Sequence, residues 1–205
     1  MSRSFSKLTC RFAMLLFICT SPRGEAQIFQ PGNLVILRLG DPTQFLVNSG
    51  NTIYLDEYTR SGALMRSVTV PDNGSTALIL SGTAATEGGL TRSLDGRELA
   101  LIGYCTNRGS TLSGSLSSQT GASVPRGVAT VDAFGNYNLL ETSLPLYSGT
   151  NPRCVIGDGT NNFWTAGGDA GTYYLAPPVA PVTIQNTILN TRYIRVRNGN
   201  LYFTT

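Results

Sequence analysis

A short unit recurs along this chain of 205 residues: a turn that contains glycine, followed by a strand of alternating apolar residues. The clearest copy is SLDGRELALIGY, residues 93–104. Its Asp-Gly turn opens onto apolar alternation, as in the second half of a β-hairpin. NSGNTIYLDEY, residues 48–58, aligns with it without a gap, a looser copy stands at 157–168 and a tighter one at 197–205. The unit predicts an all-β fold built from repeated hairpins.

The spacing of the turn glycines predicts how these hairpins are grouped. They are Gly50, Gly96, Gly159 and Gly199, so successive turns are 46, 63 and 40 residues apart. The long interval contains a Ser/Thr/Gly-rich segment, residues 106–125, which we expect to be an inserted flexible loop. Without that loop, all the intervals fall near the roughly 40–50 residues of a propeller blade. We therefore predict consecutive four-stranded antiparallel blades, about four in number, in a partial or open propeller.

The repeated Asp-Gly turn and strand resemble those of the secreted β-propeller repeat proteins, whose blades carry a Ser-x-Asp-Gly-x-x-Leu core. SLDGREL, residues 93–99, fits that core, whereas the copies at Gly50 and Gly199 lack its Asp. The resemblance covers most of residues 32–205 and implies that the first strand of each blade lines a central channel. Closed propellers usually have about four to eight blades. We expect either that the first and last strands close the ring or, as we favour, that the chain is part of a longer propeller.

The first 26 residues have the pattern of a secretory signal. Basic residues precede a short apolar run, residues 12–19, and Gly24 and Ala26 supply the small residues before a predicted cut. The apolar run is far shorter than the roughly 20 residues that a spanning helix needs, so no stable membrane insertion is expected. We predict an exported mature domain, residues 27–205, that is secreted, or periplasmic or on the cell surface if the source is bacterial.

Charge and missing residue types exclude several functions. The chain has 15 Lys and Arg, 12 Asp and Glu and no His. Removal of the predicted signal takes four basic residues and one acidic one, which leaves 11 of each and no Lys. This balance gives no electrostatic reason to expect nucleic acid as a partner. Catalytic triads, Schiff bases, P-loops and His-ligated metals are also excluded, so we predict no cofactor or metal and lean against an enzyme.

Two cysteines, Cys105 and Cys154, remain in the mature domain. In an oxidising compartment they could pair, with about 4–5 kcal/mol of stabilisation in the chain-entropy model. Two buried thiols are an equally weighted alternative, because the sequence does not give the distance between them. A further candidate modification site is Asn73, whose NGS sequence matches a glycosylation acceptor and otherwise marks a tight turn.

Arginines recur shortly before the turn glycines, at Arg92, Arg153 and Arg192, and Arg126 fits the same set. In a propeller they could form a ring that grips an anionic ligand through bidentate contacts. The alternative, which we favour, is that each pairs with a nearby acid and joins adjacent blades. Trp164 presents the same choice, because an aromatic ring stacks on sugars but more often packs between sheets.

Two acidic features need separate interpretation. Asp56 and Glu57 are adjacent, but neighbours on a strand point to opposite faces, so we expect a solvated strand end rather than a catalytic pair. Asp158 opens a stretch that resembles the start of a calcium loop, although Phe163 stands where that loop needs Gly. We expect an ordinary Asp-Gly hairpin there.

We predict an exported, non-catalytic binding or scaffold module that engages protein or glycan through its loops and inner strands. The alternative is a carbohydrate-active hydrolase or lyase that uses carboxylates, Tyr and Arg. An enzyme would gather acids from different blades on one rim, a set for which the candidates are Asp56, Asp95, Asp132 and Asp158. A scaffold would instead pair its acids with arginines.

Overall fold

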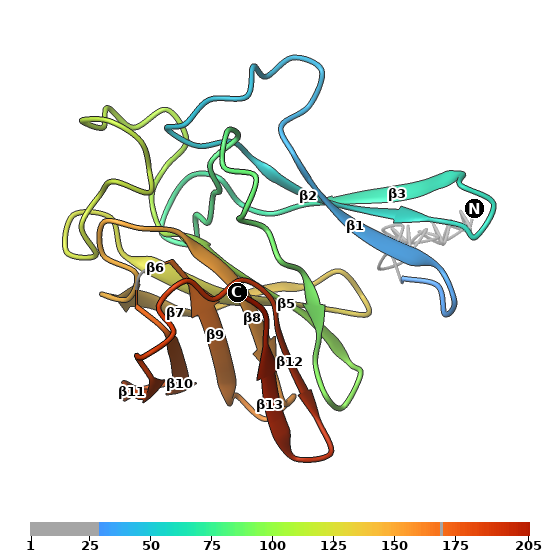
Figure 1. Cartoon of the computed structure of the whole chain (residues 1–205). Coiled ribbons are helices and arrows are strands. Elements are labelled where there is room, and N and C mark those ends of the chain that lie inside the picture. Colours follow the sequence, from blue (N-terminus) through green and yellow to red (C-terminus); the bar gives the residue numbers. More distant parts are fainter. Residues whose placement is uncertain (1–28, 169) are drawn as a thin grey trace, which may run out of the picture.

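The computed structural model describes residues 29–168 and 170–205, all of them in strands, turns and connecting loops (Figure 1). The predicted signal at residues 1–26 lies outside the described residues. Within those limits the fold is all-β, as the repeat predicts, and none of the described segments is a helix long and apolar enough to cross a membrane.

Four antiparallel sheets follow one another along the chain, and within each sheet the strands pair in sequence order. The first sheet contains β1 (Leu34–Leu39), β2 (Ile53–Tyr58) and β3 (Leu64–Thr69). The second contains β4 (Thr91–Arg92), β5 (Glu98–Tyr104), β6 (Arg126–Asp132) and β7 (Tyr137–Leu144). The third contains β8 (Pro152–Gly157), β9 (Phe163–Gly167), β10 (Thr172–Ala176) and β11 (Val179–Gln185). The fourth contains β12 (Ile194–Arg197) and β13 (Asn200–Phe203).

The repeated glycines occupy equivalent places in these sheets. Each lies between the first and second strand of its sheet, and each has a positive φ: 120° at Gly50, 76° at Gly96, 89° at Gly159 and 73° at Gly199. Glycine adopts this conformation at little cost because it has no Cβ. The sequence repeat therefore corresponds to a repeated sheet, although the described part of the chain gives the first sheet three strands and the fourth sheet two.

The hydrophobic core is divided into three clusters, each between two successive sheets. Leu55 and Leu101 meet in the cluster between the first and second sheets. Val155 belongs to the cluster between the second and third sheets, and Ile156, from the opposite face of β8, joins the cluster under the fourth. Strands β5 and β8 are thus buried on both faces, which explains their nearly continuous apolar sequences.

No strand pairing closes these sheets into a ring within the described residues. Strand β1 pairs with β2 alone, and β13 pairs with β12 alone. Closure by the first and last strands, one of the two expectations, is therefore not present.

The Ser/Thr/Gly-rich segment, residues 106–125, connects β5 and β6 as an insertion. Its own apolar residues anchor it to the core between the first two sheets. Leu116 and Val124 are buried in the first cluster, and the Leu116 backbone N–H donates to the Asn48 carbonyl at 2.9 Å. The segment closes one end of the core between the first two sheets.

Candidate functional site

A cleft of about 370 Å³ lies between the first and second sheets. One wall is the strap, residues 29–35, which leads into β1. The other consists of Arg92 and residues 96–99 around the β4–β5 turn, together with residues 131–133 at the end of β6. The clearest copy of the sequence repeat thus forms part of this cleft.

The buried side chain of Glu57 fixes the strap. It accepts hydrogen bonds from the Gln30 backbone N–H at 2.6 Å and the Asn33 side-chain amide at 2.8 Å. Its other oxygen lies 2.6 Å from the Arg66 guanidinium on β3. The expectation of a solvated strand end is therefore wrong at Glu57, because paired and hydrogen-bonded charges can be buried. Its charge positions a wall of the cleft.

Asp56 is buried on the opposite face of the same sheet. The prediction that Asp56 and Glu57 point to opposite faces is therefore confirmed, whereas the prediction that Asp56 is exposed to solvent is wrong. Its carboxylate lies 2.5 Å from the Arg38 guanidinium and accepts a hydrogen bond from the Ser67 hydroxyl. Burial alone would raise the pKa of Asp56, but these hydrogen bonds and the Arg38 charge hold it below its ordinary value. Asp56 is thus a structural ion-pair partner away from the cleft.

Two carboxylates of the cleft face each other across neighbouring strands. Glu98 on β5 is directly opposite Asp132 on β6. Burial raises the pKa of Glu98, and the charges of Asp95 and Asp132 raise it further. Burial would raise the pKa of Asp132 too, but hydrogen bonds from Asn136 and other turn amides lower it. The environments of the two groups therefore displace their pKa values in opposite directions.

The aspartates near the cleft each hold their own turn. Asp95 accepts from the Ser93 hydroxyl at 2.6 Å and from the Arg97 backbone N–H at 3.1 Å. Asp132 accepts from the backbone N–H groups of Phe134 at 2.8 Å and Asn136 at 2.9 Å. These carboxylates are therefore used as turn caps, the role that Asp and Asn side chains take in tight connections.

Asp158 does the same in the third sheet. It accepts from the Thr160 backbone N–H at 2.6 Å and the Asn162 side chain at 2.8 Å, which makes the β8–β9 connection an Asp-Gly hairpin. The described residues contain no group of three or more His, Cys, Asp or Glu side chains that could hold a metal. The neighbouring Gly159 leaves room for Asp95, whose carboxyl carbon would lie 2.2 Å from a Cβ added there. Asp95 and Asp158 thus meet where the second and third sheets approach each other.

The four predicted ligand-binding arginines lie in different environments. Arg92 is exposed, lines the cleft and donates from Nε to the Gly96 carbonyl at 2.9 Å. Arg192 is also exposed, between the third and fourth sheets. Arg153 donates to the Asn190 side chain and to the Thr191 carbonyl, and so holds the segment that leads to β12.

Arg126 is fully buried and turns away from solvent. It donates to the backbone carbonyls of Val124 at 2.7 Å, Thr150 at 2.9 Å and Gln119 at 3.0 Å. Its guanidinium carbon lies 5.0 Å from the centre of the Tyr104 ring. Arg126 therefore joins the insertion to the start of the third sheet.

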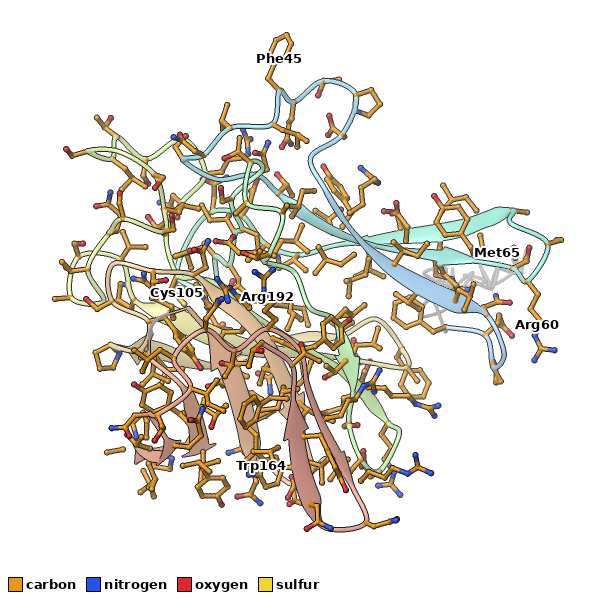
Figure 2. The ribbon with its side chains drawn as sticks, viewed as in Figure 1. Phe45, Arg60, Met65, Cys105, Trp164 and Arg192 are labelled. Atoms are coloured by element: carbon orange, nitrogen blue, oxygen red, sulfur yellow. The ribbon has the colours of Figure 1, made fainter. Side chains whose placement is uncertain are left out.

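Trp164 lies on β9 against the third cluster, with its ring 5.7 Å from that of Tyr174 (Figure 2). Cys154 is buried in the same cluster, whereas Cys105 is half-buried against the first one. Both are thiols, so the disulfide alternative is not formed in the structure. Burial raises the pKa of the Cys154 thiol to about 11, which makes it an inert core residue.

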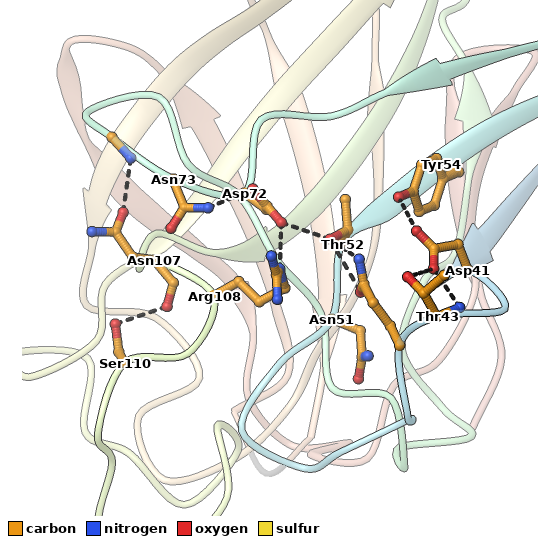
Figure 3. A network of polar contacts seen from close by, with 12 residues as sticks. Asp41, Thr43, Asn51, Thr52, Tyr54, Asp72, Asn73, Asn107, Arg108 and Ser110 are labelled. Atoms are coloured by element: carbon orange, nitrogen blue, oxygen red, sulfur yellow. Dashed lines mark hydrogen bonds and ion pairs between the residues drawn. The ribbon is translucent and has the colours of Figure 1, made fainter.

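Polar loops gather at one end of the first sheet (Figure 3). The Asp72 carboxylate accepts from the Thr52 hydroxyl at 2.6 Å and from Arg108 of the insertion at 2.6 Å. Asn73, the candidate glycosylation site, is exposed in the adjoining turn and donates to Asp72 at 2.7 Å. This network ties the insertion to the first sheet.

The polar residue that sequence reasoning missed most completely is Glu87. It accepts from the Tyr104 hydroxyl at 2.7 Å, the Asn151 side chain at 2.6 Å and the Ser81 backbone N–H at 2.9 Å. A single acidic residue in a loop has no sequence pattern that predicts hydrogen bonds to such distant segments.

The chain was compared with protein families, curated proteins and solved structures. No family model matches the chain, and neither does any curated protein or solved structure. The functional conclusion therefore depends on the geometry of the cleft.

Proposed function

We propose that this chain is an exported, non-catalytic binding module that holds a glycan in the cleft between its first and second sheets. The observation that carries the proposal is the state of the acids: Asp95, Asp132 and Asp158 are each engaged in capping a turn. Groups committed in this way are poorly placed to act as nucleophiles or general bases, because those bonds must break first.

The lining of the cleft supports a sugar ligand. All its charged and amide side chains are planar groups that form paired hydrogen bonds, the geometry that neighbouring sugar hydroxyls require. They are Gln30, Asn33, Arg92, Arg97, Glu98 and Asp132. Phe29, Leu34 and Leu99 add apolar surface for the faces of the rings. A mostly apolar cleft with a few converging polar groups is the usual form of a small-ligand site.

We also propose that the four sheets are blades of an open, propeller-like assembly. Three features support this: the consecutive strand order, the glycine between the first two strands of every sheet, and a core cluster between each pair of successive sheets. Export to a secreted location, where glycan and protein ligands are available, is supported by the signal-like first 26 residues.

Calorimetry and a reducing-end assay on the same samples test the function. The mature protein is titrated with a panel of neutral plant and microbial oligosaccharides, alongside Arg92→Gln and Glu98→Gln. We expect binding without new reducing ends, and about a ten-fold weaker affinity for each variant, as for loss of a charge-assisted hydrogen bond. Arg192→Gln, an exposed arginine outside the cleft, serves as the matched control and should bind as the unaltered protein does.

A second function, glycoside hydrolysis, is favoured by one observation. Glu98 and Asp132 are cross-strand neighbours whose pKa values are displaced upward and downward, as for an acid and its partner carboxylate. In that case the protein releases reducing ends and Glu98→Gln abolishes the release while substrate still binds. That outcome would favour glycoside hydrolysis over the non-catalytic binding module. Absence of binding to every oligosaccharide of the panel would contradict both proposed functions.

A further inference from the structure

The last hairpin has one face committed to the core and one face open. Ile194, Val196, Leu201 and Phe203 pack on the third sheet, above Cys154 and its neighbours. Because side chains alternate along a strand, the residues between them face outward. They are Arg195 and Arg197 on β12 with Asn200 and Tyr202 on β13, and all four are exposed. We call them the arginine face.

The pairing of the two strands arranges this face. Arg195 lies directly opposite Tyr202, and Arg197 lies opposite Asn200. Because the two arginines are two positions apart on one strand, their Cα atoms are about 7 Å apart. Arg195, Arg197 and Tyr202 line a shallow recess together with Asn198 of the turn.

The turn makes the arrangement rigid. Asn198 has φ 50° and Gly199 has φ 73°, which is the pattern of the tight Asn-Gly hairpin. A two-residue turn of this kind fixes the register of the strands, so the backbone positions from which the two arginines project are set before any ligand arrives.

Among the described residues, no ion pair neutralises the charge of the arginine face. From residue 170 to residue 205 the sequence has three arginines and no acid. The ion pairs found in the described parts of the chain use Arg38, Arg66, Arg97 and Arg108. Within the same limits, neither Arg195 nor Arg197 has a carboxylate partner, so both remain available to an anion.

We infer that the arginine face is a second binding site, separate from the cleft, for a polyanionic glycan. Two neighbouring guanidinium groups suit carboxylates or sulfates repeated along a sugar chain, because each guanidinium can donate two parallel hydrogen bonds to one anionic group. Tyr202, 56% exposed, provides a flat apolar surface for the sugar ring between them. Single-stranded nucleic acid fits less well, because its sites require a basic groove that tracks about 4–16 nucleotides.

Binding to three immobilised polymers tests this inference: polygalacturonate, dextran sulfate and neutral dextran. The unaltered protein should bind one or both anionic polymers more tightly than neutral dextran, and its affinity for them should fall as salt rises. The first two polymers distinguish carboxylate from sulfate as the recognised group. Arg195→Gln/Arg197→Gln should bind about ten-fold or more weakly, since two charge-assisted contacts are lost. Tyr202→Ser should weaken binding several-fold with the charge unchanged.

Arg60→Gln is the matched control. Arg60 is exposed in the turn between β2 and β3, far from Arg192 and the last hairpin in Figure 2. It should bind both polymers as the unaltered protein does. The inference is overturned if neither anionic polymer binds, if the double variant binds unchanged, or if single-stranded DNA binds more tightly than both. If Tyr202→Ser bound the polymers as tightly as the unaltered protein does, the inference would also be overturned. The arginine face would then bind anions by charge alone and would not recognise a sugar ring. None of these outcomes depends on the cleft, so the two proposals fail separately.

Discussion

At the scale of single residues, hydrogen-bonded polar side chains join the successive sheets. Glu87, in the loop before β4, contacts Tyr104 at the end of β5 and Asn151 at the start of the third sheet. Burial raises the pKa of Glu87, although three hydrogen bonds and the charge of Arg126 oppose the shift. The carboxyl group therefore connects segments distant in sequence while its ionised form is disfavoured by burial.

Glu87 gives the stability a distinctive pH dependence. Because its pKa is higher in the folded state, the folded chain binds more protons than the unfolded chain between that value and the ordinary 4.5. In this window the free energy of unfolding should rise as the pH falls. Urea denaturation at a series of pH values checks this, and Glu87→Gln should reduce the rise to the part that comes from Glu98, whose pKa is also raised. An equal rise in the variant would show that another group is responsible.

Arg126 should act on stability and not on ligand affinity. Replacement by Met removes the donor to three buried carbonyls, and each unsatisfied acceptor costs about 1–3 kcal/mol. We expect a total loss of about 3 kcal/mol or more by urea denaturation, with unchanged glycan affinity for the molecules that remain folded. The exposed control Arg192→Met should stay within about 0.5 kcal/mol. A selective loss of affinity in Arg126→Met would support the less favoured alternative, a ligand-binding arginine ring.

Single residues were predictable where the rule was local. The turn role of Asp95 follows from the Asp-Gly pair, and the opposite orientation of Asp56 and Glu57 follows from strand geometry. Their burial was not predictable, because it depends on partners that the fold brings from β1 and β3, namely Arg38 and Arg66.

At the scale of elements, the repeated unit consists of a glycine turn and the strand that follows it. The turns share a positive φ but differ in surroundings. A Cβ at Gly50 would lie 2.3 Å from Ile79 Cδ1 in the first cluster, whereas a Cβ at Gly199 would meet no heavy atom within 4 Å. Backbone conformation and packing can therefore be separated experimentally.

Alanine substitutions at these two glycines make that separation. Gly199→Ala should cost about 1–2 kcal/mol, the strain of a left-handed residue with a Cβ. Gly50→Ala should cost about 3 kcal/mol, because overpacking of the core adds to the strain. Denaturant midpoints of both variants supply the comparison. Equal losses of unfolding free energy in the two variants would mean that Ile79 moves aside at no cost, which would contradict the close packing around Gly50.

The sequence predicts the elements better than their environment. The turn glycines and alternating apolar residues locate the second strand of every sheet. Composition indicates an insertion at residues 106–125, but a high content of Ser, Thr and Gly does not indicate which of its apolar residues, such as Leu116, pack into the core.

At the scale of the molecule, the cleft arises from the order of the sheets and from one long-range fastening. The strap contacts the second sheet because the Phe29 N–H donates to the Ala133 carbonyl at 2.7 Å. Glu57, which accepts from the Gln30 N–H, attaches the strap to the first sheet. Residues more than a hundred positions apart thus form opposite walls. A repeat period of 40–50 residues predicts stacked sheets but does not predict this contact, because it lies outside the repeated unit.

The most direct test of the central claim is to locate the bound glycan by backbone amide NMR. The oligosaccharide that binds best in calorimetry is titrated into the isotope-labelled mature protein. We predict that shifts concentrate in residues 29–35, 92–99 and 131–133, which line the cleft, and that the sugar remains intact throughout. Shifts confined to other surfaces, or cleavage of the sugar during the titration, would contradict a non-catalytic binding module centred on this cleft.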